Sequence, residues 1–91
     1  MFSRKSGVSF SAVEIDERVA DVQVTDEALE VRLRDGRLIS APLKWFPRLA
    51  GASPKSRAIW ESSAAGYGIH WPDIDEDLSV AGLLKLSIGA K

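Results

Sequence analysis

The stretch that decides the fold is LEVRLRDGRLISAPL, residues 29–43. Apolar and charged residues alternate over its first five positions, which is the pattern of a strand with one buried face. Asp35 and Gly36 then suit the positive φ angles of a type I′ turn, and residues 37–43 return as the next strand. The stretch therefore predicts an antiparallel hairpin.

A two-residue turn would fix the register of this hairpin. Pro42 has no amide hydrogen to donate, so we expect the second strand to end, or to lie at an edge, near that residue. The expected cross-strand pairs on the core face are Leu33 with Leu38, Val31 with Ser40, and Leu29 with Pro42.

Outward from the hairpin, Val19–Thr25 reads as a preceding strand, and Trp45–Ala50 as one or two helical turns with Trp45 and Leu49 on one face. Ser53 and Pro54 have the residue types of an N-cap and a first helical position. The helix that they start is expected to reach about Ser62 and to turn Ile59 inward.

Further along, Ile69–Trp71 reads as a short strand, and a last helix is expected from about Leu78–Ser79. The predicted fold class is α+β, an antiparallel β-meander of three to four strands with short helices packed on one face. Residues 1–17 are interpreted as an N-terminal arm, or as an extra edge strand around Val8–Ile15. Residues 18–91 are interpreted as a single small α+β domain.

The composition limits the class of protein. With 91 residues, 45% hydrophobic and 27% charged, the chain has the size and balance of one globular domain. It has no cysteine, which excludes disulfides and thiolate chemistry. No apolar run approaches the length of a membrane span, and the N-terminus lacks the apolar core of a secretory signal. We expect a cytoplasmic protein.

Charge is distributed in blocks, although the net charge is only −1. Residues 14–30 hold seven acids and one base, residues 32–57 hold seven bases and one acid, and residues 61–77 hold five acids and no Lys or Arg. Such blocks can form separate binding patches, or they can neutralise each other in the folded chain. Neighbouring strands would interleave the first two blocks, so neutralisation is favoured.

Motifs for catalysis and metal binding are weak. Asp73-x-Asp75-x-Asp77 copies the start of a calcium loop, but the loop's glycine and its final glutamate are replaced by leucines. The single histidine, His70, could act as a base with Asp73 or Asp75, and as a strand residue it is expected to point outward. No nucleophile elbow or phosphate loop is present. We expect no enzyme activity, no cofactor and no metal.

Three tryptophans suit either core packing or a binding hot spot, because Trp and Arg are enriched in hot spots. The pairs of interest are Trp45 with Arg48 and Trp60 with Arg57. The basic block could contact phosphates, but the sequence pI is about 5.8 and no helix-turn-helix pattern is present. Direct nucleic-acid binding is therefore not favoured.

Residues 31–49 and 68–84, with the Pro54, Arg57 and Trp60 helix between them, closely resemble the family named domain of unknown function 2442. The resemblance covers about residues 19–84. It implies a small bacterial α+β domain, a kind sometimes attached to a helix-turn-helix and often encoded beside another small protein in a toxin–antitoxin-like arrangement. It carries over no catalytic residue.

The leading hypothesis is a non-enzymatic interaction domain that binds a small partner protein, with an antitoxin-like regulator as its specific form. The alternative is a small-molecule or anion-binding domain that uses His70 and the basic block. An unpaired strand edge also makes a homodimer a reasonable expectation. The candidate interface residues, or fold determinants, are Trp45, Pro47, Arg48, Arg57, Trp60, His70, Trp71, Asp75 and Asp77.

Overall fold

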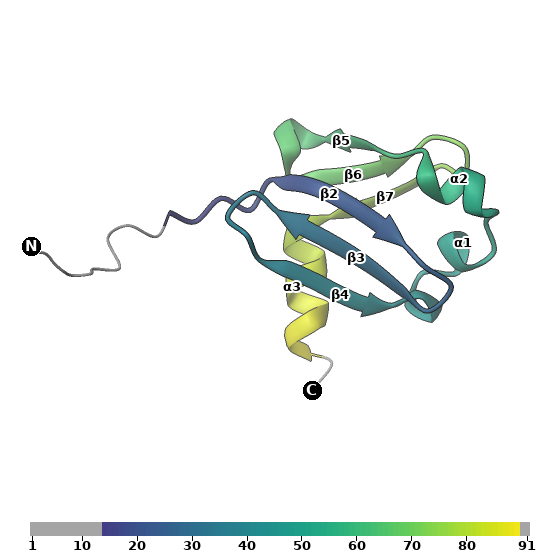
Figure 1. The fold of residues 1–91 in the computed structure, drawn as a ribbon, viewed down its shortest axis with the longest axis horizontal. Helices are drawn as coiled ribbons and strands as arrows, with labels where there is room; N and C mark the ends of the chain where they lie inside the picture. Colours follow the sequence, from purple (N-terminus) through teal and green to yellow (C-terminus); the bar gives the residue numbers. More distant parts are fainter. Residues whose placement is uncertain (1–13, 90–91) are drawn as a thin grey trace, which may run out of the picture.

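The structure is a computed structural model and describes residues 14–89. These residues form two three-stranded antiparallel sheets, three α-helices and short 3₁₀ turns (Figure 1). The predicted α+β class with an antiparallel meander is confirmed. The second sheet was not anticipated as a sheet, because only its central strand has a clear sequence pattern.

The first sheet has the strand order β2-β3-β4, with β2 at Val19–Val24, β3 at Ala28–Leu33 and β4 at Leu38–Pro42. The predicted hairpin between β3 and β4 is present, but its register differs from the prediction by one residue. The observed pairs are Val31 with Ile39, Arg32 with Leu38, Glu30 with Ser40, Leu29 with Ala41, and Ala28 with Pro42.

The register differs because the hairpin loop has three residues rather than two. The Gly36 amide donates to the Leu33 carbonyl at 3.0 Å, and the Leu33 amide donates to the Arg37 carbonyl at 2.9 Å. Gly36 has a φ of 98°, which suits the left-handed position that follows a type I turn in such loops. As a result Leu38 is 51% exposed, while Ile39 and Ala41 are buried in its place.

The second half of the chain is built from short elements. Ser53 caps the N-terminus of a helix as predicted, accepting a hydrogen bond from the Ser56 amide at 3.1 Å. The elements are η2 (Leu43–Trp45), α1 (Pro47–Ala50), α2 (Pro54–Ala58), β5 (Glu61–Ser63), η3 (Ala64–Gly66), β6 (Gly68–Trp71), β7 (Glu76–Ser79) and α3 (Val80–Gly89).

Two helix predictions in this half were wrong. The helix that begins at Pro54 ends at Ala58, and Ile59 is exposed rather than turned inward. Residues Glu76–Ser79 form strand β7, so the last helix begins at Val80. In both places the chain pairs with β6, and this non-local pairing outweighs the weak local preference for helix.

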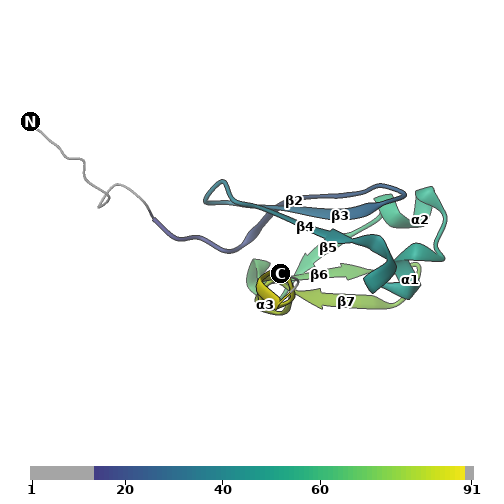
Figure 2. The ribbon, with the colours of Figure 1, turned by 90° about the horizontal axis from the view of Figure 1, so that it is seen from below.

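The core lies between the two sheets, which are stacked with α3 at one end (Figure 2). The second sheet and α3 cover one face of the first sheet, and the opposite face of the first sheet is exposed to solvent. The largest fully buried side chains are Trp71, Leu29, Leu33, Leu49, Ile69, Leu83, Val31 and Val80. No helix in residues 14–89 has the length and apolar character needed to cross a membrane.

The structure describes only the end of the segment that was predicted to be an N-terminal arm or edge strand. The proposed edge strand around Val8–Ile15 lies outside the described residues except for Glu14 and Ile15, which belong to no strand. Asp16 follows and runs beside the hairpin loop. Its carbonyl accepts the Asp35 amide at 3.1 Å, and its amide donates to the Asp35 carboxylate at 3.0 Å.

Candidate functional site

Two segments singled out in the sequence meet at one end of the molecule. Arg48 on α1 donates from Nη1 to the carbonyl oxygen of Asp75 at 2.8 Å, with the carbonyl of Ile74 at 3.5 Å. Ile74 and Asp75 lie in the turn between β6 and β7, so this arginine ties α1 to that turn. We name the group formed by Trp45, Arg48, Ile74 and Asp75 the Trp45 surface.

Trp45 is the exposed aromatic of this surface, with 37% of its area accessible. Trp45 and Leu49 were predicted on one face of a single short helix, but Trp45 ends η2 and is exposed, whereas Leu49 is buried in the separate helix α1. Leu43, Phe46 and Leu49 are all buried around it. These anchors fix the backbone on both sides of Trp45 and hold the indole at the surface.

The Arg57 side chain is largely buried and binds other parts of the fold, rather than lying free on the surface. Its Nε donates to the carbonyl of Leu49 at 2.9 Å and its Nη2 to the carbonyl of Ala50 at 3.0 Å. These carbonyls lie at the end of α1, where the helix supplies no partner of its own, and the Leu49 carbonyl also accepts the Ala52 amide at 3.1 Å. Its Nη1 pairs with Asp26 at 3.0 Å, and the arginine side chain is only 10% exposed. Arg57 therefore joins α2 to both α1 and the loop between β2 and β3.

The other two tryptophans also face inward. Trp71 is fully buried on β6, and its Nε1 donates to the backbone carbonyl of Arg57 at 3.1 Å. Trp60 is partly buried and packs against the core. Of the three tryptophans, Trp45 alone is exposed, and Trp71 is a fold determinant.

His70 points away from Ile69 and Trp71, as predicted, onto the outer face of the second sheet. Its partner is Asp77 and not Asp73 or Asp75, because β6 pairs with β7 so that His70 lies opposite Asp77. The Nδ1 and Oδ1 atoms of the pair are 2.9 Å apart. Within the described residues no cluster of His, Asp and Glu has the geometry for a metal ion, and no hydroxyl bonds to this imidazole.

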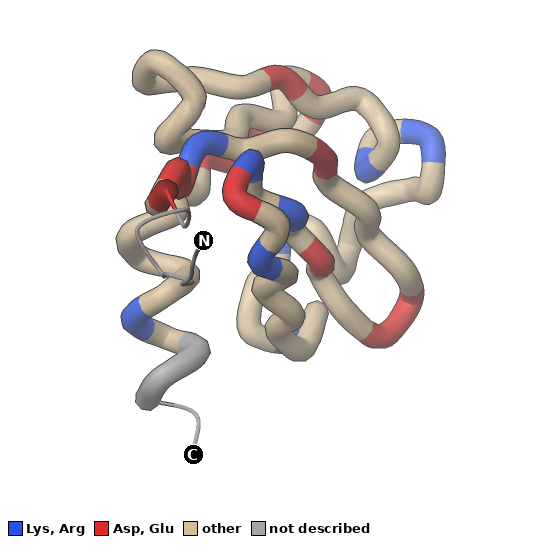
Figure 3. Tube along the Cα trace, turned by 60° about the vertical axis from the view of Figure 1, so that its left-hand side comes forward, with Lys and Arg blue, Asp and Glu red and all other residues tan. Residues whose placement is uncertain are grey.

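Among the described residues, two ion pairs join the first acidic block to the basic block, Arg37 with Glu17 and Arg57 with Asp26. Arg37 from the basic block binds Asp35 at 2.8 Å and Glu17 at 3.1 Å. Basic and acidic positions lie close together along the chain trace (Figure 3). Hydrogen bonds from the Arg37 side chain lower the pKa of Asp35 to about 2. Bonds from the Arg18 side chain and amide likewise lower the pKa of Asp16 to about 2.

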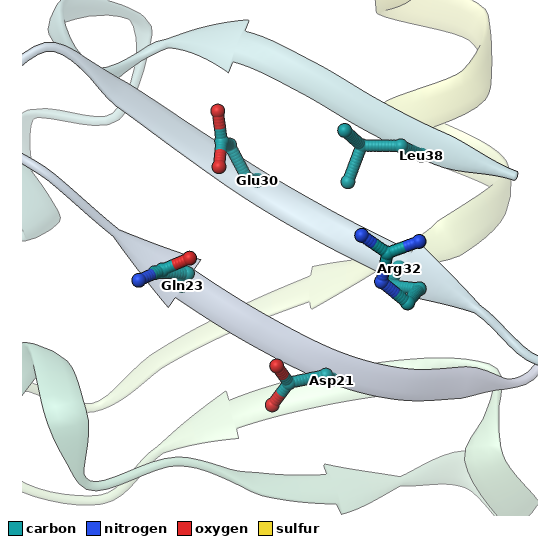
Figure 4. A pocket seen from close by; sticks show the side chains of 5 residues that line it. All are labelled: Asp21, Gln23, Glu30, Arg32 and Leu38. Atoms are coloured by element: carbon teal, nitrogen blue, oxygen red, sulfur yellow. The ribbon is translucent and has the colours of Figure 1, made fainter.

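The open face of the first sheet holds a shallow hollow that the sequence interpretation missed (Figure 4). Its volume is about 60 Å³, well below the several hundred Å³ of ordinary ligand pockets. With the correct hairpin register, the alternation of polar residues in the strands would have placed these side chains together. The hollow is lined by Asp21, Gln23, Glu30, Arg32 and Leu38.

Comparison with known proteins gives a family but no activity. A crystal structure of a protein of unknown function from Rhodospirillum rubrum is similar, with 31% sequence identity and a TM-score of 0.65. The match covers 75% of this chain and 84% of that one. No curated protein matches the sequence. The profile of the family described as "Protein of unknown function (DUF2442)" matches residues 19–89, and the chain belongs to this family.

Proposed function

We propose that this chain is a non-enzymatic protein-interaction domain that docks a small partner protein on the Trp45 surface. The observation that carries the proposal is the exposed indole of Trp45, held by buried neighbours on both sides. Tryptophan, tyrosine and arginine are the residues most enriched among those that dominate binding energy at interfaces.

The Trp45 surface is also preorganised. Arg48 is fixed by the carbonyl oxygens of Ile74 and Asp75, so little conformational freedom remains to be lost on binding. An immobilised side chain of this kind otherwise costs about 0.5–1.5 kcal/mol when an interface forms. Trp45 supplies the apolar contact, and Asp75, which is exposed and whose carbonyl binds Arg48, supplies a charge.

The specific form that we propose is an antitoxin-like regulator of a small bacterial partner in the cytoplasm. Binding would cover the surface by which that partner reaches its own target. The alternative, a small-molecule or anion-binding domain, has less support. Arg37 and Arg57 already bind carboxylates, and two of the five residues that line the sheet-face hollow are acids.

The test compares matched aromatic variants of the tagged chain. Tyr67 is 49% exposed and lies next to η3, so Tyr67→Ala is the control for Trp45→Ala. We expect a stoichiometric partner from native cells with the wild type and Tyr67→Ala, and its loss with Trp45→Ala. With the purified partner, Trp45→Ala should raise the Kd by about 30-fold, as expected for a hot-spot residue.

Two results contradict the proposal. One is a partner that binds the folded Trp45→Ala variant as tightly as the wild type. The other is a wild-type chain that captures nothing in stoichiometric amount but shifts its NMR resonances with a small metabolite, which would favour the ligand-binding alternative.

A further inference from the structure

The four outer strands of the two sheets differ in how they are protected. An uncovered edge strand invites pairing with another chain, and proteins guard such edges with charges, bulges or short length. Strand β7 carries Glu76 and Asp77, and β5 has only three residues and begins with Glu61. Strand β2 carries Asp21 next to a register shift. These three edges are therefore guarded.

Strand β4 has only its moderate length and the proline at its end, Pro42, as guards. Its sequence, LISAP, contains no charged residue, and its pairing with β3 shows no register shift. Its outer-face side chains include Leu38, which is 51% exposed. Pro42 removes one donor at the end of the strand, but the preceding residues keep theirs.

The hydrogen-bond pattern shows which backbone groups of β4 face outward. The bonds from Leu33 to Arg37 and from Leu43 to Glu27 place alternate residues of the strand against β3. In this alternation Ile39 and Ala41 direct their backbone groups to β3. The amides and carbonyls of Leu38 and Ser40 then point to the free edge, and no described residue outside the sheet bonds to them.

We propose that this edge pairs with β4 of a second copy of the chain, antiparallel and about a twofold axis at Ser40. The two Ser40 residues would then exchange a pair of backbone hydrogen bonds. Each Leu38 amide would meet the Pro42 carbonyl of the other copy, the one polar group that Pro42 can offer. The result is one continuous sheet of six strands, three from each copy.

The self-pairing is favoured by what lies on each face of β4. On the outer face Leu38 would cover Pro42 of the other copy, and no like charges oppose each other along the strand. On the inner face α3 contacts β4 and extends past its edge (Figure 1). Leu86 on that helix is an exposed apolar side chain, 46% accessible.

The first test is the mass in solution by sedimentation velocity and light scattering. We expect the wild type to approach about 20 kDa, twice the 9.9 kDa of the chain, at concentrations on the order of 100 µM. Ser40→Pro removes the central donor, and Leu38→Lys adds a charge to the edge. Both variants should be monomers that keep the wild-type circular dichroism, whereas Gln23→Lys on β2 should remain a dimer.

A second test locates the interface. The chain has no cysteine, so Ser40→Cys introduces a single thiol beside the axis. Under mild oxidation it should form a disulfide dimer at least about tenfold faster than Gln23→Cys. Trp45→Ala should leave the dimer intact, which separates this proposal from the docking function.

Three outcomes would overturn the pairing. The first is a wild type that stays at 9.9 kDa throughout the concentration range. The second is a dimer that survives both edge variants. The third is slow exchange of the Leu38 and Ser40 amides in a monomer, which would mean that a segment of the same chain already occupies the edge.

Discussion

Arg57→Ala should destabilise the domain more than the removal of any charged side chain on its surface. The substitution removes two hydrogen bonds from a charged donor and leaves the carbonyls of Leu49 and Ala50 without that partner. Hydrogen bonds that involve a charged group contribute about 1.5–3 kcal/mol each, so the lower end of this range gives about 3 kcal/mol for the pair. The ion pair with Asp26 adds less than about 1 kcal/mol, because that carboxylate is 93% exposed.

A loss of about 3–4 kcal/mol is a large share of the 5–15 kcal/mol that stabilises a typical domain. With a urea dependence of about 1.5–2 kcal/mol per molar, the unfolding midpoint should fall by about 2 M. Tryptophan fluorescence can follow the transition, because Trp71 is buried and hydrogen-bonded to the Arg57 backbone.

The control for this prediction is Asp26→Asn, which removes the ion pair and keeps the bonds to the carbonyls. It should cost under about 1 kcal/mol. The reasoning is refuted if Arg57→Ala lies within about 0.5 kcal/mol of the wild type, or if Asp26→Asn costs as much as Arg57→Ala.

Three further predictions concern other parts of the fold. The pKa of Asp35, lowered from 3.8 to about 2 by Arg37, means that the unfolded chain binds more protons below about pH 4. Stability should therefore fall as the pH drops from about 4 to 2, and Asp35→Asn should make this decline shallower in acid unfolding curves. Gly68→Ala places a Cβ 2.6 Å from the Ser63 hydroxyl oxygen, so it should cost about 1–3 kcal/mol in urea unfolding, and Ser63→Ala should recover part of the loss. The pair of His70 and Asp77 is solvent-accessible, so a double-mutant cycle with alanine and asparagine should give a coupling under about 1 kcal/mol.

The sequence predicts well where a local signal is sufficient. Alternation identified β3, and Ser53 with Pro54 identified the start of α2. The hairpin register was missed because Asp-Gly suits more than one loop length. In the folded chain the Asp16 and Arg37 amides both donate to the Asp35 carboxylate, and the bond from Asp16, 19 residues away, is one that no local pattern reveals.

The sequence identified the residues of the candidate site but did not show which of them are exposed. The residue types that suggest an interface also suit structural roles, and only the folded chain separates them. Arg57 and Trp71 face inward because backbone carbonyls take their donors. Trp45 is exposed, whereas its chain neighbours Leu43, Phe46 and Leu49 are buried. Strands β5 and β7 were missed because three or four residues are too few to show a period.

The two proposed surfaces are compatible, because they use different groups at different places. The pairing edge uses backbone atoms of Leu38–Pro42, and docking uses the Trp45 side chain three residues further on. In an antiparallel pair the two β4 strands end on opposite sides of the axis, so each copy keeps its own Trp45 at a far end. A dimer should therefore bind two partner molecules, which the mass of the complex can show. A partner that instead dissolves the dimer would mean that docking reaches the β4 edge and that the two surfaces compete.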